Sequence, residues 1–173
     1  AIALMPPIFF RPQSEECLVD WCREVSHAAG GLPLSYYESP EMSGVELDMS
    51  RFVELARAAG IHYGGLKFTD SNLEVFSSLC ADIQEGEGMW WGRDEELRDG
   101  VAAGATGAIG STYNFAAPVY RPILDERASG DGEAAAAAQA FSVSLVEAIA
   151  AYGYLPAAKA VMGMIGVPVG PAR

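Results

Sequence analysis

The feature that most constrains the fold of this chain is a regular alternation of short apolar segments with amphipathic, helix-like segments. Apolar segments typical of buried strands lie at residues 1–7, 32–37, 63–69, 88–92 and 107–112. Helices are expected between them, at residues 14–29, 50–60, 71–83 and 94–103. Strands that alternate with helices pair side by side as a parallel sheet. The sequence therefore predicts an α/β fold with five parallel strands.

The pattern changes in the last third of the chain, where the strand-like segments stop. Helices are expected at residues 115–128, 133–152 and 155–164, and the second of these contains five consecutive alanines, which are strong helix formers. We predict a single domain over residues 1–173, with strand–helix repeats in 1–114 and a helical end in 115–173. A doubly wound sheet and a (β/α) barrel both fit this pattern. No glycine-rich dinucleotide fingerprint follows an expected strand.

Serine residues precede two of the expected helices and are predicted to be their N-caps. Ser14 is followed by Glu15 and Glu16, whose charges complement the helix dipole. Ser50 is predicted to cap the next helix, which we expect to end near Gly60.

Charge and composition exclude several classes of function. The chain has 11 basic and 23 acidic residues and a formal net charge of −12, which disfavours binding to nucleic acid or to an anionic membrane. Three cysteines and two distant histidines show no metal-ligand spacing, so we expect reduced thiols and no metal site. The first residues lack a signal-peptide pattern, which predicts a cytoplasmic protein. Both ends of the chain look cut.

Polar residues gather where the expected strands end, which is where barrel enzymes place their chemistry. Lys67 is the most unusual of them because it lies inside an apolar strand. Loss of solvent would lower the pKa of its ammonium group, and a neutral amine can attack a ketone to form an imine. On local sequence alone, a snorkelling or salt-bridged lysine is the favoured alternative.

The other candidates also have two interpretations each. Tyr37 ends the neighbouring strand and could relay protons, or it could serve only in packing. Asp94 and Glu95 begin a helix, where they complement its dipole or accept hydrogen bonds from substrate hydroxyls. Ser111 either binds substrate or caps the next helix.

Three motifs of the chain belong together: Tyr-Tyr-Glu-Ser-Pro at residues 36–40, Gly-Leu-Lys-Phe-Thr-Asp at 65–70 and Gly-Ala-Ile-Gly-Ser-Thr-Tyr-Asn at 107–114. In this order and spacing they resemble the N-acetylneuraminate lyase branch of the dihydrodipicolinate synthase-like superfamily. The Gly-Ser-Thr-Tyr-Asn run discriminates best between the branches of the superfamily. The resemblance extends across essentially all 173 residues.

The resemblance implies a class I aldolase with a (β/α)₈ TIM-barrel fold and additional C-terminal helices, which is usually a homotetramer. It implies cleavage of the sialic acid N-acetylneuraminate to pyruvate and N-acetylmannosamine, with no cofactor beyond a covalent lysine imine. Lys67 matches the imine-forming lysine and Tyr37 the proton-relay tyrosine. The positions that contact the sugar are matched by Thr69, Gly92, Asp94, Glu95, Gly110 and Ser111.

The sequence also departs from the family pattern. The five strands would be the fourth to eighth of the barrel, and the loop that holds the pyruvate carboxylate in the family has no counterpart in this chain. Arg93 and Glu38 are charged where uncharged or aromatic residues are expected. Two alternatives therefore stay open: an aldolase for another 2-keto acid, and a non-catalytic fragment that binds sugar or a full-length homologue.

Overall fold

The structure is a computed structural model that describes residues 1–172 of the chain. The chain folds into two compact units, which are described separately. Unit 1 comprises Ala1–Gly92 and Ala103–Ala108, and unit 2 comprises Arg93–Ala102 and the chain from Ile109 onward. The single domain expected over residues 1–173, with its change of character after residue 114, stays a prediction.

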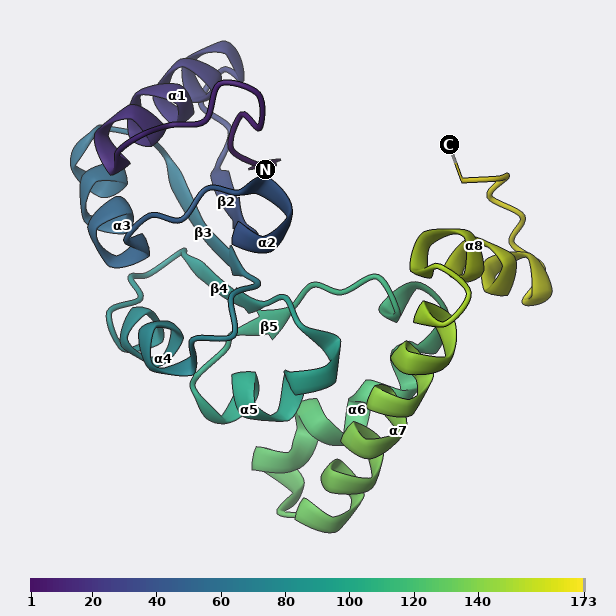
Figure 1. Cartoon of the computed structure of the whole chain (residues 1–173). Helices are drawn as coiled ribbons and strands as arrows, with labels where there is room; N and C mark the ends of the chain where they lie inside the picture. Colours follow the sequence, from purple (N-terminus) through teal and green to yellow (C-terminus); the bar gives the residue numbers. More distant parts are fainter. Residues whose placement is uncertain (173) are drawn as a thin grey trace. The chain divides into compact units, whose positions relative to one another are not determined.

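Unit 1 contains a parallel five-stranded sheet whose strands follow one another in sequence order. They are β1 (Ile2–Leu4), β2 (Leu34–Glu38), β3 (Tyr63–Phe68), β4 (Gly88–Trp91) and β5 (Gly107–Ala108). A doubly wound sheet reverses its strand order at a switch point, and this sheet has no reversal. Figure 1 shows helices α1, α3 and α4 on the same side of the strands, as successive right-handed crossovers require. This order is that of a barrel segment.

Two strands are shorter than the sequence predicts. The strand expected at residues 1–7 is only Ile2–Leu4, because Pro6 and Pro7 have no backbone N–H to donate to a ladder. The strand expected at 107–112 is only Gly107–Ala108. The rest of that segment turns toward the next helix, where the Asn114 nitrogen donates to the Ser111 carbonyl oxygen at 3.3 Å.

The helices of unit 1 confirm the predicted pattern and correct one of its caps. α1 (Glu15–Ala28) is capped by Ser14, as predicted. α3 (Met49–Ala58) is capped by Asp48 and not by Ser50, because the Asp48 carboxylate accepts the Ser50 amide. α4 spans Leu73–Ala81, and a short helix, α2 (Pro40–Ser43), occupies part of a segment expected to be a loop.

The two faces of the sheet in unit 1 differ in burial. Along β2, Tyr36 and Glu38 are buried while Tyr37 between them is half-buried, which follows from the two-residue repeat of a strand. The buried face carries aromatic rings: Tyr36 lies 4.7 Å from Phe52 of α3, measured between ring centroids. Tyr37 therefore points to the face away from this helix-covered core.

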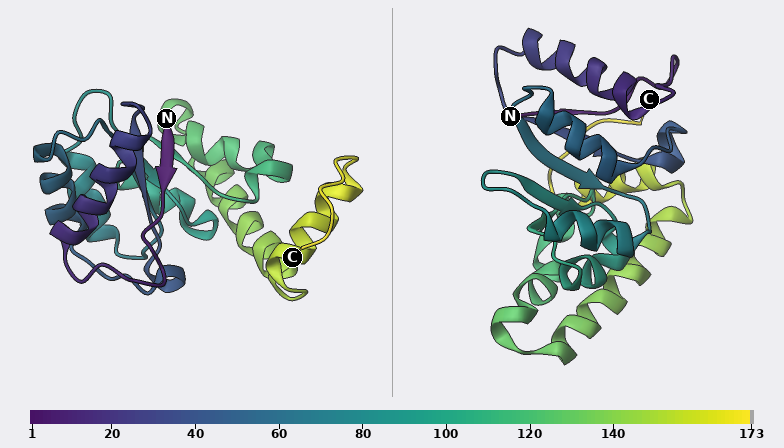
Figure 2. Two further views of the ribbon diagram at one scale, coloured as in Figure 1. Left: turned by 90° about the horizontal axis from the view of Figure 1, so that it is seen from above. Right: turned by 90° about the vertical axis from the view of Figure 1, so that its left-hand side faces the viewer.

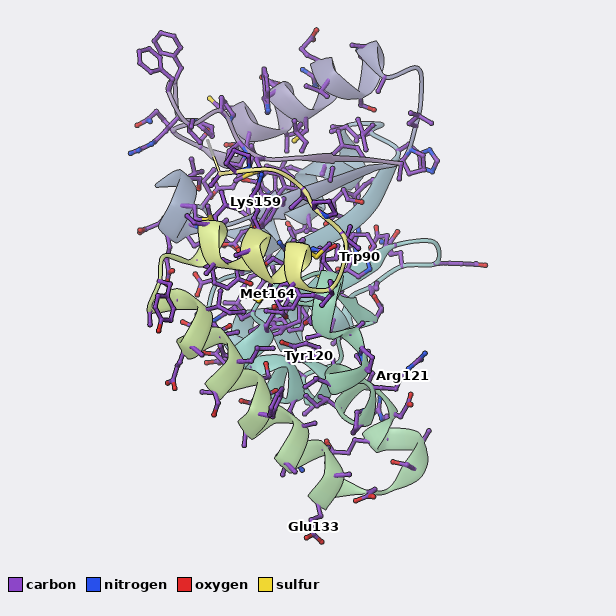
Figure 3. The ribbon with its side chains drawn as sticks, turned by 90° about the vertical axis from the view of Figure 1, so that its right-hand side faces the viewer. Trp90, Tyr120, Arg121, Glu133, Lys159 and Met164 are labelled. Atoms are coloured by element: carbon purple, nitrogen blue, oxygen red, sulfur yellow. The ribbon has the colours of Figure 1, made fainter. Side chains whose placement is uncertain are left out.

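The regular elements of unit 2, among the residues that the structure describes, are helices. They are η1 (Asp94–Glu96), α5 (Leu97–Ala102), α6 (Tyr113–Ser129), α7 (Gly132–Ala150) and α8 (Tyr154–Met164). α6 and α7 lie side by side, joined by a tight turn at Gly130, which has the positive φ of 72° that favours glycine (Figures 1 and 2). Figure 3 shows Glu133 at the N-terminal end of α7 and Lys159 on α8. The three predicted C-terminal helices are confirmed.

One helix among the described residues, α7, is long and apolar enough to cross a membrane by length and composition alone. Its apolar character comes largely from its alanines. α7 packs against α6, α8 and η1 within unit 2, and its buried residues are Ala135, Ser142, Val146 and Ile149. A single helix of this kind is weak evidence for a membrane span, because core helices pass the same test.

Candidate active site

Lys67 and Tyr37 form a pair on the open face of the sheet in unit 1. The two residues are register partners on adjacent strands, β3 and β2. The Lys67 Nζ lies over the Tyr37 ring, 3.7 Å from the ring centroid. Lys67 is half-buried rather than buried, so the strand shields it less than the sequence suggested. The negative face of the ring attracts a positive charge on this nitrogen.

Gly92 and Thr69 complete the immediate surroundings of Lys67. The Gly92 nitrogen donates to the Phe68 carbonyl oxygen at 2.8 Å. A Cβ at residue 92 would overlap the Thr69 Cγ2 and would lie 3.1 Å from the Lys67 Cε. Glycine is therefore needed there so that the lysine stem and Thr69 can occupy this space. Four of the predicted site residues therefore lie close together, namely Thr69, Gly92, Lys67 and Tyr37.

Glu38 joins the ends of β2 and β3 next to this pair. Its Oε2 accepts hydrogen bonds from the amides of Thr69, at 2.9 Å, and Asp70, at 3.1 Å. The Thr69 hydroxyl donates to the Glu38 carbonyl oxygen. Burial raises the pKa of the Glu38 carboxyl, the two amide bonds oppose this, and the charge of Asp70 adds to it.

Trp90 lies next to Lys67 on the other neighbouring strand, β4. It is the register partner of Lys67 on β4, as Tyr37 is on β2, so all three side chains lie on the same face. Its ring folds back over Gly88, where any Cβ would overlap the indole. The position of Trp90 beside Lys67 depends on the register in which β3 and β4 pair, and the sequence alone does not fix this register.

In unit 2, Asp94 is the centre of a buried hydrogen-bond network. It is 6% exposed, and its Oδ2 accepts the hydroxyl of Thr112 and, at 3.3 Å, the amide of Thr112. The Thr112 hydroxyl also lies 2.6 Å from the Tyr120 hydroxyl. A Cβ at Gly110 would overlap the Asp94 Oδ1, so glycine is required there as well. Asp94 thus has a structural role that the sequence did not predict.

One carboxylate oxygen of Asp94 takes no part in this network. Its Oδ1 is buried and has no hydrogen-bond partner within residues 1–172, and the Tyr113 hydroxyl is in the same state. Burial raises the pKa of Tyr113, and the charge of Asp94 raises it further. Contact of Asp94 with a substrate hydroxyl stays a prediction.

Ser111 and Glu95 are the remaining predicted residues, and both are exposed in unit 2. The Ser111 Oγ lies 2.6 Å from the hydroxyl of Tyr154, the first residue of α8. Ser111 and Tyr154 line a mostly apolar cavity of about 280 Å³ with Phe115, Leu155 and Met162. Sequence reasoning missed Tyr154, because 43 residues separate it from Ser111.

The part of the chain that the structure describes contains no group of three or more His, Cys, Asp or Glu side chains that could hold a metal ion. The chemistry of unit 1 is that of one amine beside one phenol ring. That of unit 2 is carboxylate and hydroxyl oxygens.

A sequence profile of the Dihydrodipicolinate synthetase family matches residues 1–173. The chain belongs to this family. It is 33% identical to N-acetylneuraminate lyase of Mus musculus over 176 residues and 31% identical to that of Homo sapiens, with 99% of the chain covered in both cases. These alignments cover 55% of each relative.

Solved structures agree with the family assignment. An N-acetylneuraminate lyase of Aliivibrio salmonicida, also called a sialic acid aldolase, superposes with a TM-score of 0.92 at 31% identity. That of Proteus mirabilis gives 0.91 at 30% identity. The superpositions cover 99% of this chain and 57–58% of theirs. The chain thus has part of the family's TIM-barrel fold, as predicted, and spans a little over half the length of these relatives.

Proposed function

We propose that this chain carries the imine-forming part of a class I aldolase that cleaves N-acetylneuraminate to pyruvate and N-acetylmannosamine. The observation that carries the proposal is the position of the Lys67 Nζ, 3.7 Å from the centroid of the Tyr37 ring on the neighbouring strand. The names of the relatives, at 30–33% identity, support the substrate class.

The proposed reaction needs one amine and a proton relay. The Lys67 amine, once it has given up its proton, attacks the C2 ketone of the substrate, and loss of water gives an imine that is protonated to an iminium. The C4 hydroxyl then loses its proton and becomes an aldehyde while the C3–C4 bond breaks, and the bonding electron pair moves to the iminium as an enamine. Protonation at C3 and hydrolysis release pyruvate and free the lysine. The Tyr37 ring face favours the cationic iminium, and its phenol is the proposed proton relay.

A related aldolase for another 2-keto acid is the second candidate. Arg93, which pairs with Glu96 at 3.0 Å, places a guanidinium directly before Asp94 and Glu95, the residues expected to bind sugar hydroxyls. The departure from the family pattern at Arg93 leaves room for a substrate with an additional anionic group. Comparing turnover of N-acetylneuraminate with that of acidic 2-keto-acid substrates separates the two candidates.

Borohydride trapping with pyruvate tests the imine directly. The chain has only two lysines, Lys67 and Lys159, so peptide mass spectrometry locates an adduct without ambiguity. We expect reduced pyruvate on Lys67, no adduct on this residue in Lys67→Ala, and an unchanged Lys67 adduct in the control variant Lys159→Ala. A folded chain that gives no adduct on Lys67 would contradict the aldolase and support a non-catalytic binding protein.

The Lys67→Ala variant also separates chemistry from folding. Because the Lys67 side chain is half-buried on the open face of the sheet, we expect its removal to change the free energy of unfolding by less than about 1 kcal/mol. Urea unfolding followed by circular dichroism measures this. Loss of the adduct together with loss of the fold would leave Lys67 a structural residue and count against the proposal.

A further inference from the structure

Glu38 lies beside the proposed reactive pair but on the opposite face of its strand. It is the last residue of β2, directly after Tyr37, and it is 5% exposed. Its register partner on β3 is Phe68, directly after Lys67. A buried charged side chain at the ends of both functional strands is unusual, because a carboxylate costs free energy when it leaves water.

The hydrogen bonds of Glu38 extend the pairing of β2 and β3 beyond the last residue of each strand. Its Oε2 accepts two amides, from Thr69 and Asp70, and its carbonyl oxygen accepts the Thr69 hydroxyl. All three bonds connect Glu38 to the turn that begins two residues after Lys67. Hydrogen bonds to an ionised carboxylate are about twice as strong as neutral ones.

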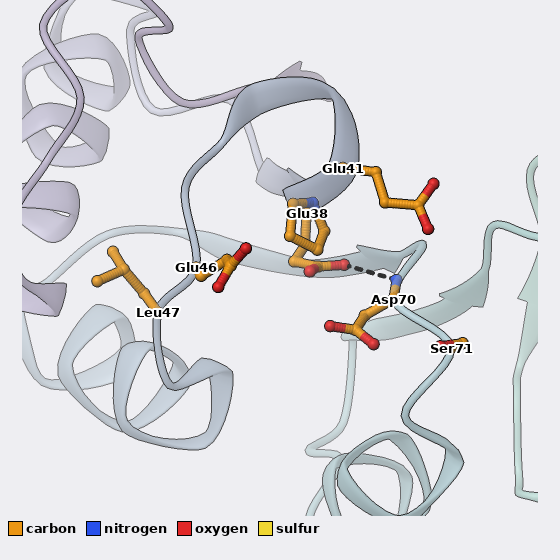
Figure 4. A pocket seen from close by; sticks show the side chains of 7 residues that line it. Glu38, Glu41, Glu46, Leu47, Asp70 and Ser71 are labelled. Carbon is orange, nitrogen blue, oxygen red and sulfur yellow. Dashed lines mark hydrogen bonds between the residues drawn. The ribbon is translucent and has the colours of Figure 1, made fainter.

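None of the described residues that line the cavity around Glu38 is basic. Glu38 lines this cavity of about 410 Å³ together with Glu41 of α2, Glu46 of the α2–α3 loop and Asp70 of the turn after β3. Figure 4 shows the Glu38 carboxylate between the side chains of Glu46 and Asp70, with its hydrogen bond to the Asp70 nitrogen. The two amides are therefore the contacts that hold the carboxylate in place.

We propose that Glu38 is a positioning residue for the imine chemistry, in that its carboxylate clamps the Thr69–Asp70 turn to the end of β2 and so keeps Lys67 opposite Tyr37. This inference rests on the function proposed above. Reaction rates are sensitive to small displacements, since a shift of about 1 Å can cost about 100-fold. The turn also carries Thr69, whose methyl group packs over Gly92 beside the Lys67 stem.

The test uses the variants Glu38→Leu, which has no acceptor, and Glu38→Gln, which keeps an acceptor oxygen. Glu46→Leu is the matched control, because Glu46 is exposed and lines the same cavity. The first measurement is hydrogen exchange of the Thr69 and Asp70 amides by NMR, which is independent of any reaction. We expect about tenfold faster exchange in Glu38→Leu and near wild-type exchange in the other two variants.

The second measurement is the rate of borohydride-trapped imine formation at saturating pyruvate. Relative to wild type, we expect about a tenfold slower rate per folded molecule in Glu38→Leu, with a nearly unchanged half-saturating pyruvate concentration, and recovery in Glu38→Gln. A residue that served stability alone would change the folded fraction and leave this rate unaltered.

The outcomes separate the clamp from the proposed function. Unchanged amide exchange in Glu38→Leu would overturn the clamp whatever the trapping shows, and an unchanged trapping rate would overturn its role in positioning. If Glu38→Leu exchanges faster but the wild-type protein forms no adduct with pyruvate, the proposed aldolase function is overturned, and the positioning role of Glu38 with it. If Glu38→Leu does not fold, the amide proton shifts of Thr69 and Asp70 are compared between wild type and Glu38→Gln. Their change with acid should be clearly smaller in Glu38→Gln, where only the Asp70 carboxylate remains beside them, and an equal change in both proteins would refute the clamp.

Discussion

The carboxylate of Glu38 links its own protonation to the stability of the protein. Burial raises its pKa in the folded state above the ordinary value near 4.5. A raised carboxyl pKa contributes stability that is fully present below the unfolded-state value and is lost as the pH rises through the folded-state value. At neutral pH the ionised group therefore lowers the free energy of unfolding.

Glu38→Gln removes this titration and leaves the neighbouring carboxylates in place. We expect the variant to be more stable than wild type at pH 7 and to lose this advantage as the pH falls toward 4.5. Urea unfolding of both proteins at a series of pH values gives the difference in their free energies of unfolding. A difference that stays constant over this range would show that the folded-state pKa of Glu38 is not raised.

Individual residues of the site were predictable where a motif or a strand end marked them. Lys67, Tyr37, Thr69 and Gly92 were proposed this way, and the structure places them close together, while their roles stay predictions. The clamp formed by Glu38 was not predictable, since its charge only looked out of place in the sequence. Its partners depend on which strands pair and in which register, and no local pattern states this.

At the scale of single elements, the N-cap of α3 shows where a sequence pattern and the structure differ: Ser50 was predicted as the cap, and Asp48 is the cap. Asp48 Oδ1 accepts the amides of Ser50, at 2.9 Å, and Arg51, at 3.2 Å. We expect Asp48→Ala to lower the free energy of unfolding by about 1 kcal/mol, because two helix amides lose their acceptor. Ser50→Ala is the matched control, with an expected effect within about 0.5 kcal/mol. Thermal unfolding measures both, and a larger loss in Ser50→Ala would restore serine as the cap.

The pairing of β3 with β4 depends on a glycine with a backbone that other residues rarely adopt. Gly65 has φ of 131°, and a Cβ there would lie 2.6 Å from the Gly88 nitrogen and closer still to the Gly88 carbonyl oxygen. We expect Gly65→Ala to destabilise the chain by about 3 kcal/mol or more, since both strain and overlap with backbone oppose it.

Gly64→Ala is the matched control for this substitution. Gly64 has an ordinary φ, and its added Cβ would meet the Pro33 Cβ at 3.2 Å and the Ser35 Oγ at 3.3 Å, where small side-chain shifts suffice. Its effect on the urea midpoint should be clearly smaller. Equal effects of the two substitutions would show that β3 and β4 do not approach as closely as the structure has them.

The positions of helices and strands were predictable because their periodicity is local. Where this failed, the cause was a specific atom: missing N–H groups at Pro6 and Pro7, and the Asp48 carboxylate in place of the Ser50 hydroxyl. The order of the strands was a different problem, because a doubly wound sheet and a barrel have the same alternation. Strand pairing and the family's motifs were needed to decide between them.

For the molecule as a whole, the number of times the chain crosses between the two compact units helps to decide whether they unfold together. The chain passes between them three times, after Gly92, Ala102 and Ala108. The edge strand β5 of unit 1 is therefore joined at both ends, through a few residues, to segments of unit 2. Unfolding of unit 2 would release β5 from two sides, so we expect a single cooperative transition, in agreement with the predicted single domain.

Thr112→Val tests this expectation from within unit 2. Thr112 is fully buried, and its hydroxyl contacts both the Asp94 carboxylate and the Tyr120 hydroxyl. Valine keeps the volume but removes these bonds, which should cost about 3 kcal/mol because a buried carboxylate loses a donor. Hydrogen exchange measured by mass spectrometry on peptides from β3 and α7 reports on each unit. Equal loss of protection in both peptides is expected from one cooperative transition, whereas loss confined to α7 would show that the units unfold separately and that the chain holds two domains.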